Sequence, residues 1–166
     1  PGSMAPMEAR AVANLAGARP GRTVLDPMCG TGGLLIEAGL LGADVVGIDA
    51  QAKMIQGTRE NLAAYLDAGV GLARGDAARL PLPDGAVEAV VIDVPYGRQS
   101  KIAGRDLQSL VGSTLAEARR LADRCVMVAD RSWASRAREV GWTLTDRFER
   151  PVHRSLTRHV HVLDTA

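Results

Sequence analysis

The sequence has few cysteines, almost no net charge and no long apolar run, and each shortage argues against a class of protein. Its two cysteines, Cys29 and Cys125, lie far apart without further Cys or His at ligand spacing, which disfavours a zinc site and favours thiols in a reducing compartment. The formal charge is +1, so any contact with nucleic acid must be local. Neither a membrane-length apolar run nor a signal-peptide pattern is present, and we expect a cytoplasmic protein.

What the sequence does contain is an alternation of strand and helix patterns. Its 166 residues, 46% of them hydrophobic, suit one buried core and are too few for two ordinary domains. Short, continuous apolar runs are typical of strands buried on both faces, and they lie at 23–26, 45–49, 89–93 and 125–129. Apolar residues at helical spacing occupy 5–17, 33–42, 52–66 and 106–121.

This order predicts the fold class. Strands that alternate with helices of this length form βαβ units with right-handed crossovers and a mostly parallel sheet. Residues 71–76 are a weaker candidate strand near an edge. The tail differs, because 142–152 and 158–164 alternate in residue type around a polar joint. We interpret the tail as an antiparallel hairpin that completes the sheet.

A glycine-rich turn follows the first predicted strand. The segment 25–33 reads LDPMCGTGG, and its glycines let a ligand approach the backbone closely. A nicotinamide enzyme is one interpretation. The dinucleotide fingerprint, however, needs glycine at its sixth position, which counted from Gly30 is Leu35. The match is incomplete, and binding of NAD in preference to another adenosine ligand would favour the oxidoreductase.

Three acids end three successive predicted strands. Asp49 lies about 20 residues after the glycine turn, where an acid can accept hydrogen bonds from both ribose hydroxyls. Asp76 is placed to bind an adenine amino group. Asp26 would repel a phosphate and attract an ammonium or sulfonium group. Together they indicate a cationic, phosphate-free adenosine ligand, and S-adenosylmethionine is such a ligand.

Three motifs carry a resemblance to a known family. The stretches DPMCGTGG, GID and DVPYG resemble class I S-adenosylmethionine-dependent amino-methyltransferases, whose fourth strand ends in (Asn/Asp)-Pro-Pro-aromatic. Within that class, residues 1–15 and 26–62 resemble archaeal tRNA guanine-10 N2-methyltransferases. The likeness weakens between 98 and 122. It implies a Rossmann-like fold with a mostly parallel seven-stranded sheet, a C-terminal antiparallel hairpin and helices on both faces.

The resemblance also implies an amine cradle at 93–96. Asp93 would accept one N–H of an exocyclic guanine amine through its carboxylate, and Val94 the other through its carbonyl. Pro95 would stiffen the turn and Tyr96 would stack on the base. Val94 stands where the family usually has proline. A valine keeps the carbonyl, but the turn loses rigidity and gains an N–H that needs a partner.

Further site residues follow from the motifs and the resemblance, and no metal ligands are among them. Cofactor contacts are expected from Asp26, Pro27, Cys29, Gly30, Thr31, Gly32, Asp49, Ala50, Asp76, Ala77 and Asp93. Phosphate contacts with RNA are expected from Arg98, Lys101 and Arg105 in the loop after the cradle, and from Arg154 and Arg158 in the hairpin. For His159 and His161 we expect a core or edge role rather than catalysis.

The resemblance further suggests what surrounds this domain. Residues 1–166 are expected to be one catalytic domain with a helical lead-in at 1–20, part of a longer polypeptide whose upstream THUMP module grips the tRNA. A small zinc-binding activator is expected near the third strand. One or two methyl transfers to guanosine-10 fit the cradle equally well. The same cradle serves amino-methylases of DNA adenine or cytosine and of a release-factor glutamine, and a non-catalytic module that binds S-adenosylmethionine or RNA also remains open.

Overall fold

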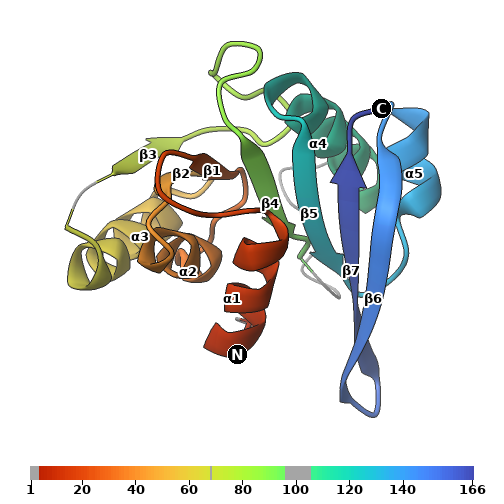
Figure 1. Ribbon diagram of the computed structural model, residues 1–166, viewed down its shortest axis with the longest axis horizontal. Helices are drawn as coiled ribbons and strands as arrows, with labels where there is room; N and C mark the ends of the chain where they lie inside the picture. The colour runs from red at the N-terminus through yellow and green to blue at the C-terminus, as the bar shows by residue number, and fades with distance from the viewer. Residues whose placement is uncertain (1–3, 68, 96–105) are drawn as a thin grey trace.

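A seven-stranded sheet with the order β3-β2-β1-β4-β5-β7-β6 organises the fold (Figure 1). The computed structural model describes residues 4–67, 69–95 and 106–166. The parallel strands are β1 (Thr23–Asp26), β2 (Asp44–Asp49), β3 (Val70–Arg74), β4 (Ala89–Asp93) and β5 (Arg124–Ala129). An antiparallel hairpin of β6 (Thr143–His153) and β7 (Leu156–Asp164) completes the sheet. The predicted mostly parallel sheet with a final hairpin is confirmed.

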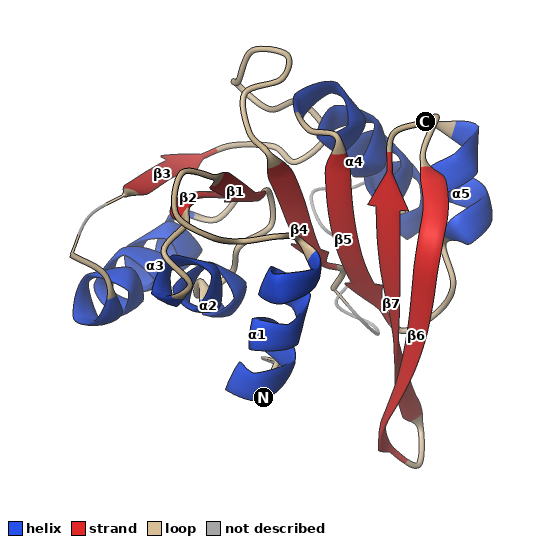
Figure 2. Ribbon diagram, in the orientation of Figure 1, coloured by secondary structure: helices blue, strands red, loops and turns tan. Residues whose placement is uncertain are grey.

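Helices cover both faces of the sheet, as predicted (Figure 2). One face packs against α1 (Pro6–Leu15), α2 (Gly33–Leu40) and α3 (Ala52–Tyr65). The other packs against α4 (Leu107–Leu121) and α5 (Ala134–Glu139). The sequence patterns missed α5, because its six residues are too few for a helical period to stand out. No helix in the described ranges is long and apolar enough to span a membrane.

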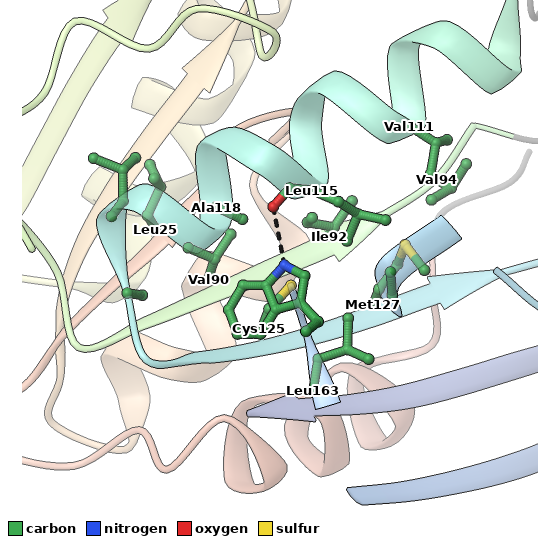
Figure 3. Close-up of a cluster of buried hydrophobic side chains, with 14 of the residues drawn as sticks. Leu25, Val90, Ile92, Val94, Val111, Leu115, Ala118, Cys125, Met127 and Leu163 are labelled. Atoms are coloured by element: carbon green, nitrogen blue, oxygen red, sulfur yellow. Dashed lines mark hydrogen bonds between the residues drawn. The ribbon is translucent and has the colours of Figure 1, made fainter. Parts of the chain in front are cut away.

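The central strands are apolar on both faces over most of their length because they contribute to two cores at once. In β4, Ala89 and Val91 belong to the core under α1, α2 and α3, whereas Val90 and Ile92 belong to the core under α4. Side chains alternate between the faces of a strand, so a strand with helices on both sides needs an unbroken apolar run. Figure 3 shows the α4 side, where the Trp142 indole Nε1 donates to the carbonyl of Leu115 at 2.9 Å.

The C-terminal hairpin extends beyond the rest of the sheet. β7 pairs with β5 only as far as His159 opposite Ala129, so the remainder of the hairpin passes the carboxyl end of β5 (Figure 1). Glu8 of α1 fastens this extension, because its carboxylate accepts Arg150 Nε at 3.2 Å and also pairs with the Arg158 guanidinium. The hairpin is therefore held beside the edge of the sheet where the parallel strands end.

His161 is a buried core residue, in agreement with the role expected for it. The Trp133 backbone N–H can only donate, so His161 Nε2 is its acceptor at 3.1 Å. The ring proton then lies on Nδ1 and is donated to the carbonyl of Met127 at 3.2 Å. Burial lowers the pKa of this fully buried imidazole below its ordinary 6.5, which is consistent with a neutral ring.

Replacing His161 with phenylalanine is expected to lower the free energy of unfolding by roughly 2–4 kcal/mol, because two buried groups lose their partners. In the parent, His161 makes stability fall as pH drops below about 6.5, since the unfolded chain then binds the extra proton. The variant should lose that component. Urea unfolding at pH 5 and pH 7 checks both effects, with His153→Phe at the exposed hairpin tip as control. Equal losses in the two variants would contradict the assignment.

Candidate active site

A pocket of about 630 Å³ opens at the carboxyl ends of β1, β2, β3 and β4. In an open α/β sheet this edge, where neighbouring crossovers leave in opposite directions, is the usual place for a ligand. Of the predicted cofactor residues, those that line the pocket are Pro27, Gly30, Asp49, Ala50, Asp76, Ala77 and Asp93. The others do not line it and lie at the end of β1 and in the loop that follows this strand: Asp26, Cys29, Thr31 and Gly32. The sequence did not single out Met28, Gln51, Met54, Arg74, Gly75 and Leu110, which also line it.

The glycine turn is held by side chains from α3. Gly32 has a φ of +86°, and a Cβ there would lie 2.9 Å from Thr58 Cγ2. Thr58 Oγ1 donates to the carbonyl of Gly30 at 2.6 Å, and Asn61 Nδ2 donates to the carbonyl of Thr31 at 2.9 Å. Glycine is therefore required at 32 both by the left-handed backbone and by the close approach of α3. This support fixes the loop that faces the pocket.

Asp49 and Asp76 are positioned by backbone N–H groups. Asp49 accepts Gly30 N at 3.0 Å through Oδ2 and Gln51 N at 2.9 Å through Oδ1. Each carboxylate oxygen has two lone pairs, so Asp49 can still accept hydrogen bonds from a ribose. Asp76 accepts Ala78 N at 2.9 Å. Both acids line the pocket. Asp49 ends β2 as predicted, whereas β3 ends at Arg74 and Asp76 lies two residues beyond it, in a turn closed by a bridge to Arg79.

Asp26 and Cys29 do not line the pocket and are buried in a low-dielectric environment. Burial raises the pKa of Asp26 to about 8, the Met28 N–H lowers it, and the nearby charges of Asp93 and Asp49 raise it. Burial likewise raises the pKa of Cys29 to about 12. Both cysteines are free and buried, so the Cys29 thiol is neutral at neutral pH and is unsuited to nucleophilic attack. Within the described residues, no group of three or more His, Cys, Asp and Glu could hold a metal ion.

The end of β4 brings the predicted amine cradle into the same pocket. Asp93 and Pro95 line it, and Val94 is buried in the core under α4, near Val111 (Figure 3). The Val94 N–H donates to the carbonyl of Val128 at 2.9 Å. Valine in place of the family's proline thus extends the pairing of β4 with β5 by one hydrogen bond, and the added N–H has its partner.

The RNA-contact predictions separate into three cases. Tyr96 of the cradle and the cations Arg98, Lys101 and Arg105 lie outside the described residues. Arg154 is exposed at the end of the hairpin. Arg158 is only 7% exposed and pairs with Glu8, so it would have to leave this carboxylate to reach a phosphate. Nothing in the residue pattern indicated this partner, which lies 150 positions away.

Comparison with known proteins places this geometry among methyltransferases. Residues 1–159 match the family described as RMKL-like, methyltransferase domain. The chain is 40% identical to the tRNA (guanine(10)-N2)-dimethyltransferase of Methanothermobacter thermautotrophicus, over 99% of this chain and 50% of that protein. It therefore spans about half the length of this relative. The crystal structure of TrmN from Thermus thermophilus superposes with a TM-score of 0.80 at 28% identity, over 99% of this chain and 50% of that one.

A second similar structure contains a partner protein. It is a Haloferax volcanii complex between the Trm112 methyltransferase activator and a methyltransferase, with a TM-score of 0.73 at 16% identity. The match covers 95% of this chain and 87% of that one. At this identity the likeness concerns the fold alone.

Proposed function

The chain belongs to the family of RMKL-like methyltransferase domains, and from this premise we propose that it methylates the exocyclic N2 amine of a guanosine in tRNA. The observation that carries the proposal is a shared pocket: Asp93 and Pro95 of the cradle face the same space as Asp49 and Asp76. A methyl donor held by the two strand-end acids would therefore lie beside the acceptor amine. The similar archaeal protein is named for guanine 10, which we take as the acceptor, with one or two methyl transfers.

The proposed methyl donor is S-adenosylmethionine, and the pocket residues fit it. Asp49 would accept hydrogen bonds from the ribose hydroxyls and Asp76 from the adenine amino group. The methionine part would lie over the glycine turn, where the buried Asp26 would favour its positive charge. The volume of about 630 Å³ is ordinary for a small-molecule site.

The chain's own contribution to the chemistry would be orientation of the amine. The lone pair of an exocyclic guanine nitrogen is delocalised into the ring, so the nitrogen is a poor nucleophile. Asp93 and the Val94 carbonyl would each accept one N–H and direct the lone pair at the methyl group. Tyr96 would stack on the base, a contact worth about 1–3 kcal/mol. The nitrogen lone pair would form the new N–C bond as the S–CH3 bond breaks and its electron pair stays on the sulfur, which becomes a neutral thioether. The surplus proton would pass from the nitrogen to the Asp93 carboxylate and from there to water.

Binding of the RNA would depend on cations around the cradle and on parts beyond this domain. We propose phosphate contacts for Arg154, Arg98, Lys101 and Arg105, and we assign Arg158 to holding the hairpin on α1. An RNA-binding THUMP module in the longer polypeptide remains part of the proposal. We further propose that a small zinc-binding activator docks on the edge strand β3, where Val70 is 41% exposed. We also propose a cytoplasmic location.

The proposal is tested with labelled S-adenosylmethionine and three acceptors: unmodified tRNA transcript, plasmid DNA and a release factor. The protein should carry its natural flanking sequence. The expected product is N2-methylated guanosine, found by nucleoside mass analysis and absent when guanine 10 of the transcript is replaced by adenine. Label in DNA or in the release factor would be consistent with the proposed amine-binding role of residues 93–96 but would show that tRNA is not the substrate. Cofactor binding without transfer to any acceptor would favour a non-catalytic module.

A further inference from the structure

A second pocket lies where β5 ends, and the proposed function leaves it without a role. Its volume is about 300 Å³. Its lining side chains come from α4, from the segment after β5 and from α5, and all of them except the Glu139 carboxylate carry hydrogen-bond donors: Gln108, Arg131, Ser132, Trp133, Ser135, Arg136 and Glu139. A donor-rich hollow of this kind suits a ligand that only accepts hydrogen bonds.

This second pocket is adjacent to the cradle. β4 and β5 are parallel neighbours with Asp93 opposite Val128, and the Val94 N–H continues their pairing. The segment that follows β5 therefore leaves the sheet beside the segment that follows β4. The first turns of α4 border both spaces, because Leu110 lines the cofactor pocket and Gln108 lines the second one. If a base occupied the cradle, the RNA backbone next to that base would therefore be able to reach this pocket.

The walls of the pocket are fixed by buried contacts. Trp133 is 4% exposed and its backbone is held by His161 from β7. The Arg136 guanidinium lies across α4 at Gly112, where a Cβ would come within 2.3 Å of Arg136 Nε. Because Gly112 has no side chain, the Arg136 guanidinium can occupy this space. Glu139 fixes the same guanidinium through Nη1 at 2.7 Å.

The donors of the pocket exceed its acceptors. Arg131 is paired with Asp130, and Arg136 with Glu139, but each guanidinium has five N–H groups. Four buried side-chain atoms of the described residues have no hydrogen-bond partner, and two of them, Trp133 Nε1 and Arg136 Nε, belong to side chains that line this pocket. A buried donor without a partner is costly, so the site would gain by receiving an acceptor-rich anion. Phosphate oxygens match paired guanidinium groups well.

We propose that this pocket binds a backbone phosphate of the RNA strand next to the target guanosine. The inference rests on the proposed function and names a subsite of it. Phosphate contacts fix the register of a bound strand without reading its sequence. A phosphate held at the end of β5 would therefore set which nucleotide enters the cradle at the end of β4.

The first test uses the two indole N–H signals of the 15N-labelled protein. The chain has two tryptophans, and the indole of Trp142 is occupied by the Leu115 carbonyl. Inorganic phosphate, titrated at constant ionic strength against chloride, should shift the Trp133 signal saturably and leave the Trp142 signal in place. Arg136→Gln and Arg131→Gln should each raise the midpoint at least several-fold. Equal shifts of both signals, or the same shifts with chloride, would overturn the site.

The second test measures direct binding of tRNA transcript as a function of salt. Arg131→Gln should weaken binding roughly 3- to 10-fold and reduce the slope of log K against log salt by about one. Arg138→Gln, an exposed position of α5 outside the pocket, is the matched control and should change neither. A variant slope equal to the control would overturn the RNA subsite even if phosphate binds. If these binding results hold and no RNA is methylated, only the proposed reaction fails.

Discussion

Asp93→Ala is expected to lower the rate of methyl transfer by about 10²- to 10³-fold, the usual loss when one oriented polar group of a reacting centre is removed. Asp93 ends β4 and faces the pocket beside Pro95. Without its carboxylate, one N–H of the acceptor amine has no partner and the lone pair is no longer directed at the methyl group. Asp49, Asp76 and the glycine turn remain, so affinity for S-adenosylmethionine should stay within a few-fold. Single-turnover rates and calorimetric titration separate the two quantities.

Asp44→Ala is the matched control for this experiment. Asp44 is an exposed carboxylate at the opposite end of β2, so the variant removes the same charge without changing the pocket. Its rate should equal that of the parent. An Asp93→Ala rate within twofold of the control would remove Asp93 from the reaction. A rate that falls only in proportion to cofactor affinity would instead assign Asp93 to cofactor binding.

The acids at the carboxyl ends of the strands could be predicted from the sequence, because the residues just before each acid show where the strand ends. Asp49 and Asp93 end β2 and β4, Asp76 follows β3 by two residues, and the carboxyl ends of parallel strands meet at one edge of a sheet. Their meeting in one pocket follows from this local pattern and the βαβ rule. The glycine turn is equally local, since its residues follow β1 directly.

The supporting contacts were not predictable because they join segments far apart in sequence. Thr58 and Asn61 hold the glycine turn from 28 and 30 positions away, and nothing in the α3 pattern separates them from other polar helix residues. Arg158 looked like a free cation in a basic stretch until the fold brought Glu8 beside it. The Val94 departure from proline gained meaning only when the Val128 carbonyl was seen opposite its N–H. Side chains that position the site are thus set by tertiary packing.

Asp26→Asn is expected to stabilise the protein at neutral pH, since it removes a buried acid that folding forces to stay protonated. Burial raises the pKa of Asp26 from about 3.8 to about 8. Between these values the unfolded chain has lost the proton and the folded chain keeps it, so the parent loses stability as pH rises, by about 1.4 kcal/mol per pH unit. Asn cannot ionise and keeps an oxygen for the Met28 N–H. The gain should be on the order of 4 kcal/mol at pH 7.

Urea unfolding of parent and Asp26→Asn from pH 5 to pH 8 checks this, with the exposed Asp44→Asn as control. The difference between parent and variant should widen as pH rises and level off above about 8. A difference that is constant over this range would contradict a raised pKa. The same variant should bind S-adenosylmethionine more weakly, because a bound positive charge draws the Asp26 proton off and pairs with the carboxylate that remains. Increased stability with undiminished affinity would show that Asp26 serves the fold and not the cofactor. Increased stability with reduced affinity would identify the buried acid as a destabilising group retained for binding a cationic ligand.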